Sequence, residues 1–538
     1  MVEGEARELV GAVERELRSL ESAVTLAHWE ASTTGTPEAL EKATVAERQI
    51  RLYLSSRPRY ERIVALLESG RVQDRQLHRQ LELLALDHRS NLLTEEVIDD
   101  LVRRSNEIQA EFYNFRARIG EREVTNNEIR GILRAERDEE RRRTAWEASK
   151  QIAPRVADRL LELVARRNEA ARSLGFRDYY AMQLELAEID EDELLGVFGE
   201  LKQRTDREFA QAKAEIDEQV APRYGLPVEE LRPWHYEDPF FQEAPLAQEL
   251  GLEAHFRGRD LAAIADAFYA GIGLPLTDVL ARSDLYERPG KDQHAYCTNI
   301  DREGDVRILC NLRDDDRWMG ILLHELGHAA YEKYIPVSLP WILRQPAHIA
   351  TTEAIAMFMD RLALDTDWLE SAVGIKLENR APLQRRARQA LRFEMLLTAR
   401  WVLVMTYFEK ALYADPSRDD LGRYWWDLVE ELQLLKRPEG RAAPDWSAKI
   451  HLTAAPVYYH NYLLGELIAS QLGSAIQAEL LDGGSHAGLA GRSELGAFLQ
   501  ERVFAPGASV HWQHLLEQAT GSRLTPEPFL HEFLPIPA

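Results

Sequence analysis

Most of the chain repeats apolar and polar residues with the period of an α-helix. From Glu3 to about Val220, Ala, Leu, Glu and Arg recur at helical spacing with few prolines, as in "RVADRLLELVARRNEAARSLG". Helical periodicity returns in the last third of the chain, where it is interrupted at "ADPSRDD", "KRPEGRAAPD" and "LDGGSHAGLAG". The pattern predicts a mainly α protein built from long amphipathic helices.

One stretch interrupts this pattern near the middle of the chain. The segment "APRYGLPVEELRPWHYEDPFFQEAP" (221–245) is rich in Pro and aromatic residues and predicts an ordered crossing between two lobes. We therefore expect a helical N-terminal lobe over 1–220 and a second, mainly helical lobe over 221–538.

The β pattern of the chain lies in "DQHAYCTNIDREGDVRILC". Two short runs flank a Gly-containing turn, and Val306, Ile308 and Cys310 alternate on one face, which predicts a β-hairpin over 292–311. The chain has two cysteines, Cys297 and Cys310, too few for a disulfide framework. We expect free thiols, although the two could face each other across the hairpin.

Composition and charge narrow the function classes. The 538 residues include 66 Lys and Arg against 90 Asp and Glu, a net charge of -24, which disfavours nucleic acid as a partner. The acidic start "MVEGEARELVGAVEREL" does not resemble a secretory signal, and no apolar stretch is long enough to span a bilayer. We expect a cytoplasmic protein with no membrane partner, and the oligomeric state stays open.

A predicted helix over 318–334, "WMGILLHELGHAAYEKY", is apolar on nearly every side yet carries two histidines and a glutamate. His324 and His328 are four residues apart and project from one face, with Glu325 about 100° further round. Two neutral imidazoles at this spacing bind Zn²⁺, and the adjacent carboxylate acts as a general base toward water. The alternative is a surface helix with hydrogen-bonded histidines. The apolar surroundings disfavour it, because burying an unpartnered carboxylate is costly.

Two nearby features refine this prediction. Gly327 in the middle of the helix costs about 1 kcal/mol relative to Ala, so it predicts the close approach of a second helix. Upstream, Asp314, Asp315 and Asp316 are interpreted as capping and dipole-compensating residues without a catalytic role.

A catalytic zinc ion needs a third protein ligand and one open position. "AHIATTEAIAMFMDRLAL" supplies the candidate Glu353, a lone acid in an apolar helical run; its alternative is an acid stabilised by a helix N-terminus. Asp360, seven residues on and on the same face, is either a partner that orients a zinc-binding histidine or a surface acid at the helix end. The prediction is one catalytic Zn²⁺.

The sequence HELGH followed after 24 residues (329–352) by a helical Glu resembles the gluzincin peptidases of the angiotensin-converting-enzyme and thimet-oligopeptidase families. The resemblance implies a helical, deeply clefted fold, in which 1–220 would form a lid and a cleft wall and 221–538 the catalytic lobe. It implies His324, His328 and Glu353 as zinc ligands and Glu325 as base. It extends from about Arg143 to the C-terminus through "AWEASKQ", "LVARRNEAARSLGFRDYY" and "HWQHLLEQATGSRLTPEPFLHEFLP".

The segment "AKIHLTAAPVYYHNYLLGEL" resembles both branches of this group. The converting-enzyme family has Lys-x-His followed by Tyr-x-x-Tyr, and here Lys449 and His451 precede Tyr459 and Tyr462 with one extra residue between them. "PVYYHNYLLG" is also similar to the tyrosine-rich segment of bacterial oligoendopeptidases. The resemblance implies that Tyr462 and His451 stabilise the oxyanion, although tyrosines three residues apart on an apolar helix also suit core packing. Asn461 stands where the family has a chloride-binding Arg, so that chloride site is not expected.

The resemblance also implies a substrate-binding set. Lys449 would bind the terminal carboxylate of a peptide as a point charge, assisted by Tyr459 and by Gln242 of "PFFQEAP". The strand that begins at His294 and Ala295 lies at the position of the family's substrate-binding edge strand, with His294 30 residues before His324, and would bind peptide backbone by β-pairing.

These observations predict zinc-dependent hydrolysis of oligopeptides, with release of C-terminal dipeptides as the leading function. An oligoendopeptidase is the first alternative, and a single-residue metallocarboxypeptidase is a third, because "HELGHAAYE" is also similar to the helical carboxypeptidases. A catalytically silent peptide-binding protein is the alternative from another class. The presence of Glu325 disfavours it, because a binding protein needs no general base.

Overall fold

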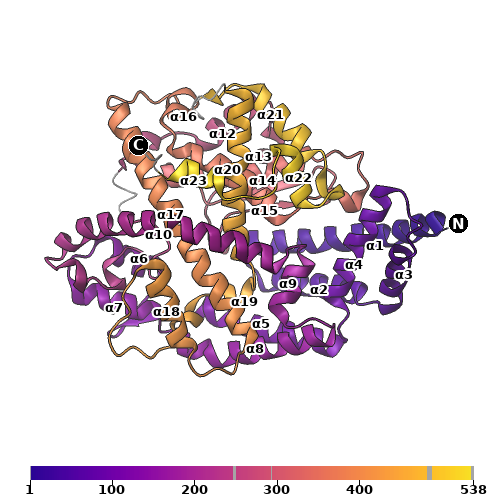
Figure 1. The fold of residues 1–538 in the computed structure, drawn as a ribbon, viewed down its shortest axis with the longest axis horizontal. Coiled ribbons are helices and arrows are strands. Elements are labelled where there is room, and N and C mark those ends of the chain that lie inside the picture. The colour runs from indigo at the N-terminus through magenta and orange to yellow at the C-terminus, as the bar shows by residue number, and fades with distance from the viewer. Residues whose placement is uncertain (1, 246–249, 293, 482–487, 535–538) are drawn as a thin grey trace. The chain divides into compact units, whose positions relative to one another are not determined.

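The computed structural model describes residues 2–245, 250–292, 294–481 and 488–534, which form helices and two short antiparallel hairpins (Figure 1). The predicted mainly α class is confirmed. Contacts divide the chain into two compact units. Unit 1 comprises Met1–Leu92, Leu250–Ala387 and Leu464–Phe529, and unit 2 comprises Leu93–Glu249, Arg388–Leu463 and Leu530–Ala538.

The boundaries of these units do not coincide with those of the predicted segments 1–220 and 221–538, because each unit combines three separate parts of the chain. The buried core shared by the first helices, which includes Leu17 and Leu84, also includes Trp341 and Ile342. The first 92 residues therefore pack with the segment that follows the zinc helix. The expected division into two lobes around a cleft stays a prediction.

Unit 1 contains the hairpin and the zinc helix. Its first helices are α1 (Val2–Thr34), α2 (Pro37–Leu54), α3 (Arg57–Glu68) and α4 (Arg75–Asn91). Its middle segment forms α11 (Glu253–Phe256), α12 (Leu261–Gly271), α13 (Thr277–Arg282), α14 (Asp316–Tyr334), α15 (Ile349–Asp360) and α16 (Thr366–Ser371). Its last segment forms α21 (Ser493–Leu499) and α22 (Trp512–Thr520).

Unit 2 is also helical. Its members are α5 (Glu95–Asn114), α6 (Asn126–Ala135), α7 (Glu139–Ser149), α8 (Ala153–Ser173), α9 (Tyr179–Leu186), α10 (Glu191–Val220), α18 (Leu421–Gln433) and α19 (His451–Ala454), with a small hairpin of β1 (Ala117–Ile119) and β2 (Arg122–Val124). The helices α17 (Arg380–Ala414), α20 (His460–Leu480) and α23 (Glu527–Phe533) have residues in both units.

The predicted hairpin is present with shorter strands. In unit 1, β3 (Tyr296–Asn299) pairs antiparallel with β4 (Val306–Leu309), and Cys297 lies opposite Ile308. Leu309 is buried together with Ile308 and Cys310, so β4 is covered on both faces. Both cysteines are free thiols.

The zinc helix α14 begins at Asp316, two residues before the predicted start at Trp318, and ends at Tyr334 as predicted. Asp315 is its N-cap, and its carboxylate accepts a hydrogen bond from the Trp318 backbone N–H at 2.7 Å. Asp314 instead accepts from the Gly258 N–H at 2.6 Å. None of the described helices combines the length and the hydropathy that crossing a membrane requires.

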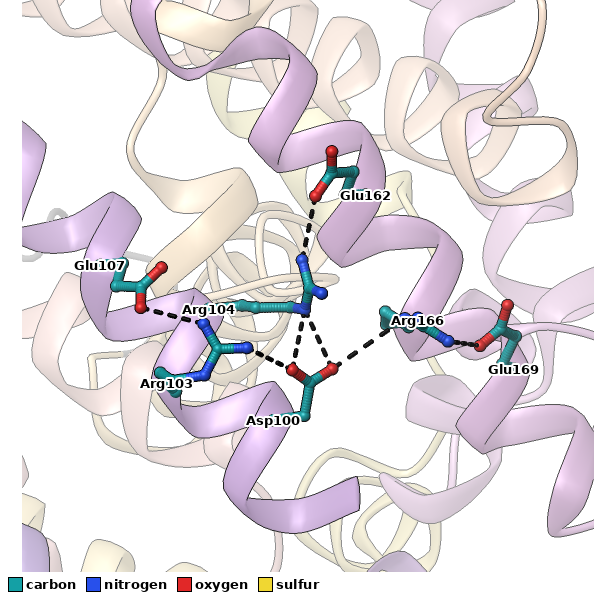
Figure 2. Close-up of polar contacts among 7 residues, drawn as sticks. All are labelled: Asp100, Arg103, Arg104, Glu107, Glu162, Arg166 and Glu169. Atoms are coloured by element: carbon teal, nitrogen blue, oxygen red, sulfur yellow. Dashed lines mark hydrogen bonds and ion pairs between the residues drawn. The ribbon is translucent and has the colours of Figure 1, made fainter. Parts of the chain in front are cut away.

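A network of exposed charges joins α5 and α8 in unit 2 (Figure 2). Asp100 on α5 accepts from Arg104 at 2.9 Å, and Arg104 also donates to Glu162 of α8 at 3.0 Å. The flanking pairs are Arg103 with Glu107 at 3.0 Å and Arg166 with Glu169 at 2.7 Å. The network links two helices at the surface of the unit.

Candidate metal centre and active site

The three predicted metal ligands lie on two neighbouring helices of unit 1. α14 carries His324 and His328, and α15 carries Glu353. One ligand atom from each of these residues lies within 4.8 Å of the other two. The Nε2 atoms of His324 and His328 are 3.7 and 3.9 Å from Glu353 Oε2. These separations are too long for hydrogen bonds and close to the roughly 3.3 Å between ligands that tetrahedral zinc imposes.

The other ring nitrogen of each histidine is held by a neighbour. His324 Nδ1 lies 3.0 Å from Asp360 Oδ2, and His328 Nδ1 lies 2.7 Å from Thr352 Oγ1. Because a carboxylate only accepts, the neutral, metal-binding form of His324 carries its proton on Nδ1 and directs the lone pair of Nε2 toward the centre. The same orientation of His328 fits donation to the Thr352 hydroxyl. Asp360 thus lies where an orienting partner of a metal ligand should lie.

Two glycines allow three helices to meet at the centre. A Cβ on Gly327 would lie 2.8 Å from Ala356 Cα of α15, so the predicted close approach of a second helix is confirmed. On α20, a Cβ at Gly465 would lie 3.0 Å from Glu353 Cβ and 2.9 Å from Met357 Sδ. α15 is buried along its whole length from Ala350 to Met359. The backbone that carries Glu353 is therefore enclosed by helices on two sides.

Burial and charge shift the acid–base properties of these groups. Burial lowers the pKa of His324, but the hydrogen bond and charge of Asp360, with the charges of Glu325 and Glu353, outweigh it and raise that pKa to about 9. Burial and the neighbouring His324 lower the pKa of His328 to about 3. Burial also raises the pKa of Glu325 to about 7, against the charge of His324. A base with a pKa near neutrality is suited to taking and returning a proton.

These residues fit a zinc ion. Two imidazole nitrogens and one carboxylate oxygen are the ligand types of catalytic zinc sites, and three protein ligands leave one position for water or substrate. Both carboxylates of the centre are buried, with Glu325 7% and Glu353 6% exposed. A divalent cation between them compensates charge that burial would otherwise make costly. The side chains thus meet the requirement for a ligand set and for an adjacent base.

The predicted carboxylate-binding residues form a separate cluster within unit 2. Lys449 Nζ donates to Gln242 Oε1 at 2.8 Å and lies 5.7 Å from the centre of the Tyr459 ring. The rings of Phe240 and Trp401 lie 5.2 and 5.1 Å from the same ammonium. Burial lowers the pKa of Lys449 to about 8, with Arg130 adding to the effect and nearby acids opposing it. The structure therefore brings together the three residues that the sequence grouped.

Asp238 sets the orientation of Gln242 in this cluster. The buried Asp238 carboxylate accepts from the Gln242 backbone N–H at 3.3 Å and from its side-chain Nε2 at 3.4 Å. The amide oxygen of Gln242 is thereby left toward Lys449. Phe241, directly before it, has a φ of 52° and its carbonyl accepts from Gln433 at 2.7 Å. The Gln242 segment is a constrained turn.

The predicted oxyanion residues lie on neighbouring turns of the same unit. The rings of His451 and Tyr459 are 4.8 Å apart, and those of Tyr459 and Tyr462 are 5.5 Å apart in an edge arrangement. The ring of Tyr462 also lies 5.3 Å from that of Tyr458. The aromatic packing that the sequence offered as an alternative is thus present for these tyrosines.

Two buried ionisable side chains hold the backbone between His451 and Tyr459. Arg167 of α8 donates to the carbonyl of Leu452 at 3.0 Å and to that of Thr453 at 2.7 Å. Glu409 of α17 accepts from the Val457 N–H at 2.7 Å. Val457 has a φ of 57°, which is unfavourable for a β-branched residue, and this hydrogen bond stabilises it. The turn that precedes the tyrosines is therefore fixed from two helices.

The predicted edge strand begins in unit 1 with an exposed residue. The His294 side chain is 92% exposed and its Nδ1 lies 3.3 Å from Asp292 Oδ1. Ala295 is half-buried and directly precedes β3.

Sequence reasoning missed Thr352, Asp238, Arg167 and Glu409. Thr352 directly precedes the predicted ligand Glu353, and a helix neighbour of a ligand is a position where a hydroxyl could have been considered. Asp238 lies in the quoted crossing segment 221–245. Arg167 and Glu409 lie in ordinary helical patterns that carry no such signal.

Comparison with protein families places two matches on the chain. Residues 280–534 match the model described as peptidase family M3, and residues 1–225 match the model described as angiotensin-converting enzyme. A comparison with curated proteins finds no match. The first match contains the metal cluster and the tyrosine segment, and the second covers the first 225 residues. The predicted kinship with both gluzincin families is confirmed.

Both matched families consist of zinc metallopeptidases, and the cluster of two histidines and a glutamate supplies the ligands that this chemistry needs. The chain is a zinc-dependent metallopeptidase that acts on peptides and is similar to the angiotensin-converting-enzyme and M3 peptidase families.

Proposed function

We propose that this peptidase removes dipeptides from the C-terminus of oligopeptides. The observation that supports this proposal is the buried Lys449 ammonium, which is 8% exposed and whose neighbours are an amide oxygen and three aromatic rings. An ammonium held in this way has unused N–H donors and a surplus positive charge, because its direct hydrogen-bond partner Gln242 is neutral. A peptide carboxylate satisfies both, and its charge would restore the pKa that burial lowers.

The proposed roles at the metal centre follow from the side chains. His324, His328 and Glu353 would hold zinc, which lowers the pKa of a water that it binds and polarises the carbonyl of the scissile bond. Glu325 takes the proton of the attacking water and returns it to the departing amine. Asp360 and Thr352 keep the two imidazoles in the orientation that exposes Nε2.

We assign the stabilisation of the oxyanion to Tyr462 and His451. A phenolic O–H and an imidazole N–H are suitable donors for developing negative charge. The turn held by Arg167 and Glu409 supports this role, because it restricts the backbone between His451 and the tyrosines.

An oligoendopeptidase that cuts internal bonds is the second candidate. The match to peptidase family M3 favours it, because that match covers the metal cluster and the whole tyrosine segment. In this case Lys449 would support the turn around Gln242 and would not contact substrate.

The test compares a free-acid decapeptide with its C-terminally amidated counterpart, each incubated with the zinc-loaded enzyme and with a chelator. Mass spectrometry of the products should show release of the C-terminal dipeptide from the free acid, suppressed by the chelator and strongly weakened by amidation. Lys449→Met should raise the KM for the free acid and leave the amidated peptide unaffected. Internal cuts of both peptides at similar rates would instead establish the endopeptidase.

A further inference from the structure

A charged cavity lies beside the C-terminal half of the zinc helix in unit 1. Its volume is about 540 Å³, and it is lined by four acidic and four basic side chains together with the aliphatic Ile335 and Val337. The lining comes from α13, from the turn between β3 and β4, and from α14 and the segment that follows it. The cavity therefore borders both the zinc helix α14 and the hairpin that contains the predicted substrate-binding strand.

Most of the charges in the cavity neutralise one another. Asp278 pairs with Lys333 and with Arg282, the latter at 3.3 Å. Glu303 pairs with Arg344 at 3.5 Å, and Asp305 pairs with Arg307 at 2.6 Å. Arg302 is paired at 2.6 Å with Glu21 of α1. Three of the four acids thus have a cationic partner.

Glu332 is the exception among the acids of the cavity. Its Oε2 accepts a hydrogen bond from Asn299 Nδ2 at 3.0 Å, and within the described part of the chain no Lys or Arg lies at ion-pair distance from it. Burial raises the pKa of Glu332, and the bond from Asn299 and the charge of Arg302 oppose this in part. A half-buried carboxylate with a neutral amide as its direct partner is a position where an added cation is stabilising.

The position of Glu332 relates it to the general base. Glu332 follows Glu325 by seven residues on α14, so both lie on the same face with about 10 Å of helix between them. The strand β3 runs along this face. Burial and the charges of Glu332 and Glu325 raise the pKa of Cys297, and the Asn299 side chain donates a hydrogen bond to Glu332. From Cys297 to Asn299, the strand therefore runs from the level of the general base Glu325 toward the cavity.

The strand β3 has one edge that borders no other strand within the described residues. It is the outer strand of the two-stranded sheet, while β4 is bordered by Asp284 on its other side. Ile300 N–H bonds to Asp305 O across the hairpin, so the alternation of an antiparallel ladder directs the backbone groups of Cys297 and Asn299 to the outer edge. A peptide that pairs antiparallel with this edge has its N-terminal part near Asn299. At about 3.4 Å per residue, the 10 Å between base and cavity correspond to roughly three residues.

We propose that Glu332 forms a subsite for a cationic group of the substrate, located about three residues before the scissile bond. The group is an ammonium or a guanidinium, supplied by a Lys or Arg side chain or by the N-terminus of a short peptide. The proposal rests on peptidase activity with the peptide paired to β3, and it holds for dipeptide release and for internal cleavage alike. It makes Glu332 a specificity-determining residue.

The experiment uses N-acetylated peptides of one sequence in which a single Lys or its uncharged analogue norleucine stands two, three or four residues before the bond that mass spectrometry shows to be cut. The zinc-loaded wild-type enzyme should cleave the Lys peptide with a kcat/KM about tenfold higher than the norleucine peptide at one of these positions. Glu332→Gln should reduce that ratio to about one and leave kcat/KM for the norleucine peptide unchanged. Glu332→Lys should favour Glu at the same position.

Two controls complete the design. Glu303→Gln changes an acid of the same cavity that Arg344 already neutralises, so it should keep the preference for Lys. Peptides with a free N-terminus placed three residues before the cut bond separate the two sources of the cation, since the α-ammonium should then replace the Lys side chain. Wild-type enzyme without a preference at any position, or a preference that survives in Glu332→Gln, overturns the proposal. Absence of cleavage of every peptide would instead contradict the peptidase function, and the two failures are distinguishable.

Discussion

The metal centre of unit 1 and the ion network of unit 2 both collect acids and bases within hydrogen-bonding distance, but they differ in exposure. At the metal centre Glu325 and Glu353 are 7% and 6% exposed. In the network, Glu162 and Glu169 have side chains 65% and 60% exposed (Figure 2). Water competes for every charge in the network and for few at the centre.

The comparison shows why similar contacts have different consequences. In water-exposed pairs the gain is small, because each side chain exchanges one partner for another and loses conformational freedom. At the buried centre an uncompensated charge is costly, so the acids there require a nearby histidine or a metal. Burial accordingly lowers the pKa of His328 to about 3 and raises the pKa of Glu325 to about 7. The following changes test this difference, from the largest expected effect to the smallest.

Glu325→Gln removes the base and keeps the shape of the side chain. We expect kcat to fall by roughly 10²- to 10⁴-fold, because proton transfer at this step is lost, while the zinc content stays at one per chain. Turnover of the free-acid decapeptide and elemental analysis measure the two quantities. An active variant would remove Glu325 from the mechanism, and a zinc-free one would show a role in binding the metal.

Glu409→Gln tests a buried acid of unit 2 that no metal compensates. Burial raises the pKa of Glu409 to about 8, and the Val457 N–H and Arg167 only partly oppose it. A folded-state pKa above the unfolded value means that stability is highest at low pH and is lost as pH rises toward 8. The wild type should lose roughly 2 to 4 kcal/mol between pH 5 and 8 from this group. Urea unfolding at both values should show a smaller loss in the variant, and equal losses would contradict the assignment.

Asp360→Asn weakens the metal centre from outside the ligand set. Because Asn cannot supply the negative charge that orients His324, we expect the affinity for zinc to fall about 10- to 100-fold. Competition with a chromophoric chelator measures it. Thr352→Val, which removes the hydroxyl at His328, should weaken zinc less, and a reversed order would mean that Thr352 is the more important partner.

Gly327→Ala places a methyl group between α14 and α15. The new Cβ would lie 2.8 Å from Ala356 Cα, so the helices must separate, which we expect to cost about 1–3 kcal/mol of unfolding free energy. Gly320→Ala on the same helix is the matched control. Its Cβ would meet Ala363 Cβ at 3.7 Å, so the gain in helix propensity should stabilise by up to about 1 kcal/mol. Two variants with the same sign would contradict the close approach.

Asp100→Ala removes the acceptor at the centre of the exposed network. We expect a loss of less than about 1 kcal/mol, reduced further in 1 M salt, because Arg103 and Arg166 are more than half exposed and Arg104 is half-buried. Denaturant unfolding of the full chain at low and high salt measures the change. A loss of several kcal/mol would show that the network is as strongly coupled as a buried site.

The sequence predicted those features that depend on local pattern. The buried helix with His324 and His328 four residues apart, the close neighbour at Gly327 and the hairpin each follow from spacing within a short segment. The lone acid Glu353 was found for the same reason, since an acid in an apolar run needs a partner.

The sequence did not predict features that depend on the register between distant segments. Thr352 reaches His328 because α15 lies at a particular height along α14, and helical periodicity does not specify that height. Arg167 and Glu409 form hydrogen bonds with the turn 452–457. This turn begins 285 residues after Arg167 and ends 48 residues after Glu409. The composition of the two units could not be predicted for the same reason. The first helices pack with Trp341 and Ile342, and this contact depends on tertiary packing between distant segments.

The glycine contacts on either side of Glu353 bear on which ions the centre can accept. Gly327 packs directly against α15, and Gly465 packs directly against Glu353. Moving the three helices apart would leave unfilled gaps in this packing, so their spacing is restricted. Zinc–ligand bonds of about 2.0–2.2 Å suit such a fixed spacing, whereas calcium requires about 2.3–2.6 Å and six to eight oxygen ligands. The close packing of these glycines thus favours a metal ion with short ligand bonds, such as zinc, over a larger ion such as calcium.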